Sequence, residues 1–151
     1  MKNKFLLFLT FIFIVQCGYT VVNHSELNQY YIEAFDLEGE NRINRILKRN
    51  ILFYSKEANK NIFNLKINTK KNKNVLEKNI KNQIVKYQIS IDAAVEIYNL
   101  KSGKTSSDTF SVAGELVVAN KNIDTRNNET KLIENLIKEM SENIIKKIKA
   151  L

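Results

Sequence analysis

Cys17 is the only cysteine of the chain, and it directly follows a short apolar run. Lys2 and Lys4 precede that run, which extends over residues 5–15. A helix needs about 20 apolar residues to cross the bilayer core, so this run is too short for a good membrane span. A basic start followed by a short apolar segment is the anatomy of a secretory signal peptide. We therefore expect residues 1–16 to be a signal peptide.

A cysteine at the end of a signal peptide is typical of bacterial lipoproteins. We expect Cys17 to become the lipid-modified first residue of the mature protein, because a lone thiol in an exported protein is otherwise unexplained. Gln16 occupies a position where such cleavage sites usually carry a small residue. A cleaved secretory signal with an incidental cysteine and an uncleaved N-terminal anchor therefore remain alternatives. Gly18, rather than Asp, is compatible with export to the outer membrane.

The other reactive residue types are too few to build a catalytic or metal site. His24 is the only histidine, so no transition-metal ligand set can form, and we expect it to be a solvated linker residue. Asp36 and Glu38 form a carboxylate pair, but such a pair at a strand end is usually a surface feature. The four glycines are scattered and form no phosphate loop, and no nucleophile elbow occurs. We expect no enzyme, no metal and no cofactor.

Composition indicates one folded domain on a tether. Beyond the signal peptide we expect a lipidated N-terminus and tether over residues 17–28 and a single domain over residues 29–151. The net charge of +8 favours anionic partners, although abundant Lys, Asn and Ile without Pro are also typical of an AT-rich genome. Because an exported protein does not normally meet nucleic acid, we expect no nucleic-acid partner.

Apolar periodicity predicts the elements of this domain. Aromatic and β-branched residues predict a strand over residues 29–37, and alternation with a period of two predicts strands over residues 61–69, 85–97 and 110–118. Apolar residues at helical spacing predict one helix from about residue 40 to residue 55 and a long one from about Thr125 to the chain end. The basic segment 70–82 is interpreted as a long connection that can extend one or both flanking strands, and residues 99–108 as a hairpin turn.

The resulting order is β-α-β-β-β-α, which predicts an α+β fold. Each strand has one apolar face and each helix one apolar stripe. The simplest arrangement packs the two helices on one face of a four-stranded, mainly antiparallel sheet. The other face of the sheet should be polar and available to water or a partner.

This layout resembles the LPS-assembly lipoprotein LptE family. Residues 17–19 (Cys-Gly-Tyr) are similar to the family's Cys-Gly-aromatic start, and the element order over residues 29–151 is that of the family. Residues 87–99 resemble its central strand, which leads into a glycine hairpin, here at residues 101–104. The similarity covers nearly the whole mature chain as a pattern rather than a motif. The family's proline-containing segment after the cysteine has no counterpart in this Pro-free chain.

The resemblance implies an outer-membrane lipoprotein on the periplasmic side. Members of the family form a one-to-one plug-and-barrel complex with the β-barrel LptD, help it to fold and assist insertion of lipopolysaccharide into the outer leaflet. Family members use the loop between the second and third strands for lipopolysaccharide contact. By resemblance, Lys70, Lys71 and Lys73 would bind lipid A phosphates. The alternative is a solvated basic segment in a Lys-rich protein.

Two other functions remain open at this stage. The chain could be an auxiliary periplasmic lipoprotein of a lipid transporter, bound to an inner-membrane permease. It could also be a structural surface lipoprotein without a transport role.

Overall fold

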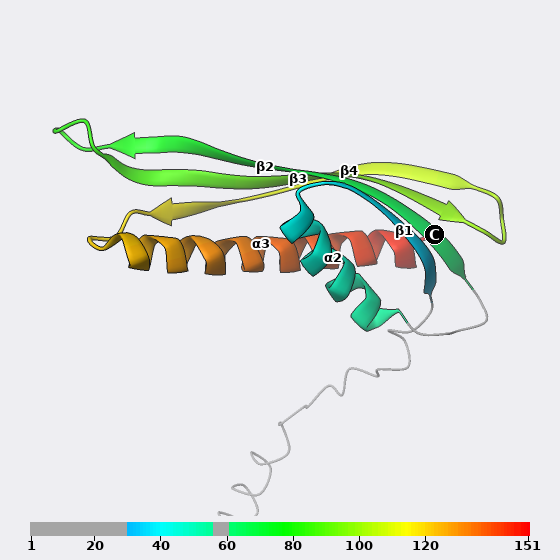
Figure 1. Ribbon diagram of the computed structural model, residues 1–151. Coiled ribbons are helices and arrows are strands. Elements are labelled where there is room, and N and C mark those ends of the chain that lie inside the picture. The colour runs from blue at the N-terminus through cyan, green and yellow to red at the C-terminus, as the bar shows by residue number, and fades with distance from the viewer. Residues whose placement is uncertain (1–29, 56–60) are drawn as a thin grey trace, which may run out of the picture.

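The computed structural model describes residues 30–55 and 61–151, and it confirms the expected α+β class and element order. The predicted signal peptide, Cys17 and the whole predicted tether, with His24, lie outside these residues. Both helices lie on the same side of one curved sheet (Figure 1). The elements are β1 (Tyr31–Gly39), α2 (Asn41–Tyr54), β2 (Ile62–Lys78), β3 (Ile84–Asn99), β4 (Thr105–Val117) and α3 (Asn122–Lys149).

The sheet has the order β1-β2-β3-β4 and is mixed. β1 pairs with β2 in parallel, whereas the β2–β3 and β3–β4 pairs are antiparallel. A parallel pair needs a crossover connection, and α2 provides it. Both antiparallel pairs are joined by short hairpin turns, and the sequence predicted the one between β3 and β4, which contains Gly103. Gly103 itself has a positive φ of 67°, which glycine adopts without steric cost.

The β2–β3 hairpin is much longer than the sequence predicted. Segment 70–82 is not mainly a connection, because β2 continues to Lys78 and pairs with β3 along its length. The turn is confined to residues 79–83. Asn79 shapes it, since its Oδ1 accepts hydrogen bonds from the N–H groups of Lys81 and Gln83 at 2.9 and 3.0 Å. The tip of this hairpin lies at one end of the molecule, at the left of Figure 1.

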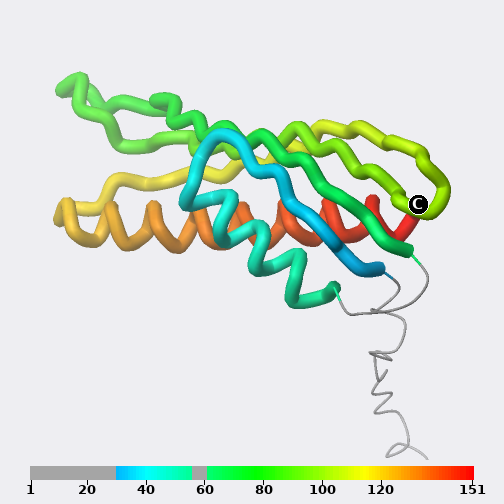
Figure 2. The backbone as a smooth tube through the Cα atoms, turned by 45° about the vertical axis from the view of Figure 1, so that its right-hand side comes forward, coloured from blue at the N-terminus to red at the C-terminus, as the bar shows by residue number. Residues whose placement is uncertain are grey.

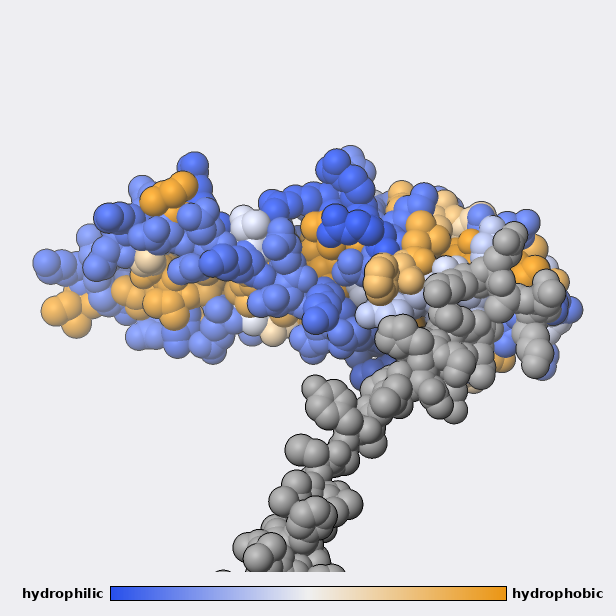
Figure 3. Space-filling view, turned by 90° about the horizontal axis from the view of Figure 1, so that it is seen from below, coloured by the Kyte–Doolittle hydropathy of each residue, from blue (hydrophilic) through white to orange (hydrophobic). Residues whose placement is uncertain are grey.

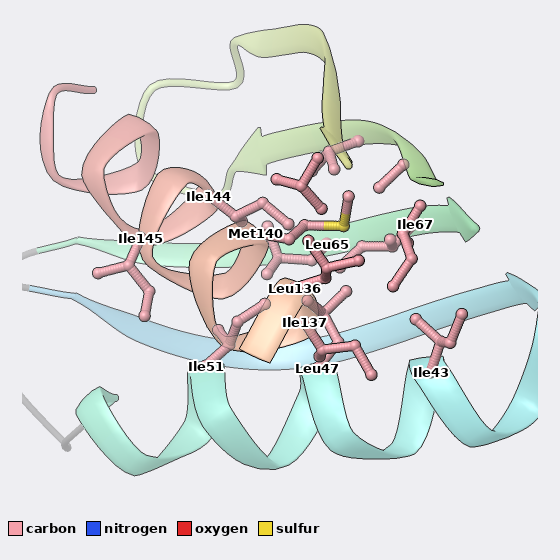
Figure 4. Close-up of a cluster of buried hydrophobic side chains, with 14 of the residues drawn as sticks. Ile43, Leu47, Ile51, Leu65, Ile67, Leu136, Ile137, Met140, Ile144 and Ile145 are labelled. Carbon is pink, nitrogen blue, oxygen red and sulfur yellow. The ribbon is translucent and has the colours of Figure 1, made fainter. Parts of the chain in front are cut away.

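The core lies between the sheet and the two helices. α2 contributes Ile43, Leu47 and Ile51, which have the helical spacing predicted from the sequence. The apolar stripe of α3 meets them and the inner face of the sheet (Figure 4). Fully buried side chains of β2, β3 and α3 include Phe63, Leu65, Ile67, Ile89, Ile91, Ile97, Ile137, Met140 and Ile144.

The turn from β1 into α2 depends on one glycine. Gly39 has φ +90°, and a Cβ at this position would overlap the carbonyl oxygen of Thr69 on β2. The backbones are held this close by a small polar cluster. The Thr69 hydroxyl donates to Asn44 Oδ1 at 2.8 Å, and Asn44 Nδ2 donates to the carbonyl of Glu38, also at 2.8 Å. Since Thr69 and Asn44 are buried, their mutual hydrogen bond avoids a desolvation penalty.

Hydrogen bonds connect the start of β1 to the end of α2. Tyr30 is buried, and its hydroxyl donates to the carbonyl of Ile51 at 3.2 Å. The N–H of Ile32 donates to Ser55 Oγ at 3.0 Å. Burial raises the pKa of the Tyr30 hydroxyl well above its usual range, which keeps it protonated as a donor. Tyr30, the first described residue, therefore lies beside the last turn of α2.

The helix α3 begins earlier than expected. It starts at Asn122 rather than near Thr125, and its N-cap residue, Lys121, makes no side-chain capping bond. The Thr125 hydroxyl instead accepts the N–H of Ala119 at 2.9 Å and closes the turn from β4. Among the residues that the structure describes, no helix is long and apolar enough to span a bilayer.

Candidate functional site

The three predicted lipopolysaccharide-binding lysines lie on β2, not in a loop, and they do not form one patch. In the β2–β3 register, Lys71 and Lys73 are opposite the core residues Ile91 and Ile89. They therefore point to the helix side of the sheet. Lys70 lies between them in sequence and points to the opposite face, because successive side chains of a strand alternate. The strand geometry separates Lys70 from the other two.

Lys73 is already engaged within the domain. Its Nζ lies 2.6 Å from Glu129 Oε2 on α3 and 4.5 Å from the centroid of the Tyr87 ring. These contacts connect the long extension of β2 to the first turns of α3. Lys73 would have to break its ion pair with Glu129 to bind a phosphate, whereas Lys70 and Lys71 have no such ion pair within the described residues.

The outer face of the sheet is polar, as predicted, and carries a set of paired charges. Lys66 Nζ lies 3.1 Å from Glu38 and 3.7 Å from Asp36, so it bridges the two carboxylates that the sequence analysis considered as a pair. The hydrogen bond and charge of Glu38, reinforced by Asp36, raise the pKa of Lys66. Asp92, opposite Lys70, accepts hydrogen bonds from Asn72 and Ser111.

Sequence reasoning missed the tip of the β2–β3 hairpin. Ile80 is fully exposed there, at 103 % of its reference area, and it stands between Lys78 and Lys81. Leu76, also exposed, precedes the turn. An isolated isoleucine in a run of Lys and Asn can be recognised in the sequence as unusual. Only the position of the turn at residues 79–83 shows that its side chain is exposed to solvent. The tip combines an apolar side chain with flanking cations.

A groove lies between the two helices. It has a volume of about 330 Å³ and runs between the second half of α2 and the middle of α3. Asn50 Nδ2 donates to Ser141 Oγ at 3.2 Å across its floor. Within residues 30–55 and 61–151, no group of three or more metal-ligating side chains comes together. Apolar and charged side chains line the groove.

No protein-family model matches the chain, and no curated protein matches it in sequence. Several solved structures, however, share its fold. The rare lipoprotein B from Shewanella oneidensis superposes with a TM-score of 0.59 at 8% identity, covering 78% of this chain and 95% of that one. A candidate lipoprotein from Caulobacter crescentus CB15 gives 0.59 at 12% identity, with coverages of 84% and 92%.

A third structure, the uncharacterized lipoprotein B from Nitrosomonas europaea, gives a TM-score of 0.63 at 12% identity. It covers 82% of this chain and 86% of the other. At these identities the likeness establishes a shared fold. The shared fold extends over most of each of the three chains.

Proposed function

We propose that the protein is a non-enzymatic, lipid-anchored outer-membrane lipoprotein that plugs and helps assemble the LptD β-barrel for lipopolysaccharide insertion. The observation that carries the proposal is the match of the whole domain to three proteins described as lipoproteins, in a chain whose Cys17 follows a signal-like segment. The resemblance to the LptE family provides the assignment to the barrel. Acylation of Cys17 would place the domain on the periplasmic side of the outer membrane.

The surface properties of the domain support a role as a plug. The outer face of the sheet bears Lys, Asn, Ser, Asp and Glu side chains, and the helix side is largely hydrophilic (Figure 3). A polar surface suits the water-filled lumen of a large barrel, whose inner wall is also polar. The domain is elongated, since α3 alone is about 42 Å long at 1.5 Å per residue. Such a shape could occupy a lumen along its length.

The hairpin tip supports contact with lipopolysaccharide. Lipopolysaccharide presents phosphates beside acyl chains, and the tip presents Lys78 and Lys81 beside Ile80. Lysines pair with phosphates as point charges, while the isoleucine can contact acyl chains. We therefore place the first contacts at the tip and at Lys70 and Lys71, and we assign Lys73 mainly to the domain structure.

Controlled depletion of the protein tests this function in cells. If it assists barrel assembly, depletion should leave the barrel misassembled and should reduce newly made lipopolysaccharide at the cell surface. Complementation with the full chain should restore both, and Cys17→Ser should restore them poorly. Normal barrel assembly and normal surface lipopolysaccharide after complete depletion would contradict the proposal.

A further inference from the structure

The last turn of α2 carries an exposed aromatic pair. Phe53 is 76% exposed, and its ring packs edge-on against Tyr54 with centroids 5.1 Å apart. The neighbouring Leu52 is also exposed, at 40%. A large aromatic side chain left in solvent beside other apolar groups typically marks an interaction surface.

Two adjoining hollows extend this aromatic pair toward the end of α3. Phe53 and Tyr54 line the groove between the helices, and Tyr54 also lines a smaller hollow of about 250 Å³. Ile145 is common to both hollows. Eight of the side chains that line the two hollows are called the tether-end patch: Arg49, Phe53, Tyr54, Lys138, Glu142, Ile145, Lys146 and Lys149.

The tether-end patch has unpaired positive charge. None of its basic side chains, Arg49, Lys138, Lys146 and Lys149, forms an ion pair with another residue of the described part of the chain. Glu142 is its only carboxylate. Glu134, which lines the groove beside the patch, is already paired with Arg42 at 3.9 Å. Aromatic rings with surrounding cations are the composition found where proteins meet the headgroups of anionic bilayers.

The position of the patch agrees with that partner. Because Tyr30 is hydrogen-bonded to Ile51 and Ile32 to Ser55, the start of the described domain lies next to the patch. Figure 2 shows this end opposite the β2–β3 tip, with the C-terminus on the same side. Figure 3 shows hydrophobic groups among hydrophilic ones at this end.

We propose that the tether-end patch binds the surface of an anionic phospholipid bilayer and sets the orientation of the anchored domain. The segment between Cys17 and Tyr30 can reach at most about 45 Å when fully extended. That reach is similar to the length of α3, so the tether alone would permit any tilt. Contact through Phe53 and the cations selects an upright domain, with the hairpin tip directed away from the bilayer.

This proposal uses the proposed lipid anchor only to bring the patch close to a membrane. The bilayer is favoured over a protein partner because the cations are unpaired and spread around a shallow, open surface. A dry protein interface would have to pair or exclude them. The lipid anchor would provide most of the affinity for the membrane, and the tether-end patch would set the orientation of the domain on it.

The absence of tryptophan from the chain permits a direct test. Phe53→Trp and Val117→Trp each give the full chain a single tryptophan, one in the patch and one at the exposed end of β4, outside both the patch and the hairpin tip. Each protein is added to vesicles of phosphatidylcholine with about one third phosphatidylglycerol, and to phosphatidylcholine vesicles alone. We expect a blue shift and strong quenching by brominated lipid for Phe53→Trp on the anionic vesicles only, and neither change for Val117→Trp.

Neutralising the cations provides the matched control. Arg49→Gln, Lys146→Gln and Lys149→Gln together, in the Phe53→Trp protein, should remove most of the blue shift, and so should high salt. Circular dichroism verifies folding, and Lys149→Gln alone replaces the triple variant if that variant unfolds. No shift at position 53, an equal shift on neutral vesicles, or a larger response at position 117 would overturn the proposal. Co-purification with the barrel is measured separately, so either proposal can fail without the other.

Discussion

Lys73 of β2 and Glu129 of α3 form an ion pair with 2.6 Å between Nζ and Oε2. Both side chains are less than half exposed, and the pair lies beside the ring of Tyr87. It joins two segments that are 56 residues apart in the sequence. The family resemblance suggested Lys73 as a lipopolysaccharide contact. In the structure, Lys73 connects the long β2–β3 hairpin to α3.

Removing this ion pair should loosen the domain slightly. Lys73→Ala and Glu129→Ala should each lower the free energy of unfolding by about 0.5–1 kcal/mol, and the double variant should lose less than the sum. Lys70→Ala, on the opposite face and without an ion pair, is the matched control and should leave stability unchanged. Urea unfolding measures all four proteins. Equal effects of Lys70→Ala and Lys73→Ala would show that the ion pair contributes nothing.

The close approach of Gly39 to β2 predicts a larger effect. Gly39→Ala should lower the free energy of unfolding by about 2 kcal/mol or more, because a Cβ overlaps the Thr69 carbonyl and φ is positive. Gly103→Ala has a positive φ but no atom within 4 Å of the added Cβ, so it should cost only about 1 kcal/mol. Thermal unfolding compares the two. A smaller loss for Gly39→Ala than for Gly103→Ala would contradict the tight β1–α2 turn.

Asp108 should make stability depend on pH in the acid range. Its carboxylate lies 3.0 Å from Lys147 Nζ, and this hydrogen bond, together with the N–H of Thr109, lowers its pKa. A lowered folded-state pKa stabilises the domain above the ordinary Asp value of about 3.9, and this contribution is lost as the pH falls through the folded value. Because both side chains are substantially exposed, the effect should be small and weaker in high salt.

Unfolding measured between neutral pH and about pH 2 checks this expectation. Asp108→Asn should be slightly less stable than the native chain at neutral pH, and the difference should vanish at the acid end. A difference that grows as the pH falls would have the wrong sign for a carboxylate with a lowered pKa.

The sequence predicted the fold wherever side-chain periodicity is set by burial. β3 alternates because one of its faces lies on the core, and Ile89, Ile91 and Ile97 are fully buried there. The second half of β2 gave no such signal. Its Lys and Asn residues extend past the main core, and pairing with β3 holds them in a strand. The strand propensities of the individual residues therefore could not predict this part of β2.

The site was harder to predict than the fold for the same reason. Lys70, Lys71 and Lys73 are a compact cluster in sequence, but a strand with a period of two directs them to opposite faces. The exposure of Ile80 depends on where the turn falls. The tether-end patch joins α2 to the end of α3, which are about 90 residues apart, and only tertiary packing places Tyr54 beside Ile145. No local pattern carries that information.

Isolation of the tagged full chain from gently solubilised outer membranes, with its partners identified by mass spectrometry, tests the proposed plug-and-barrel function most directly. We predict one large β-barrel of the LptD type in near one-to-one ratio with the tagged protein. Recovery of an inner-membrane permease instead, or of the protein with no partner, would contradict the proposal.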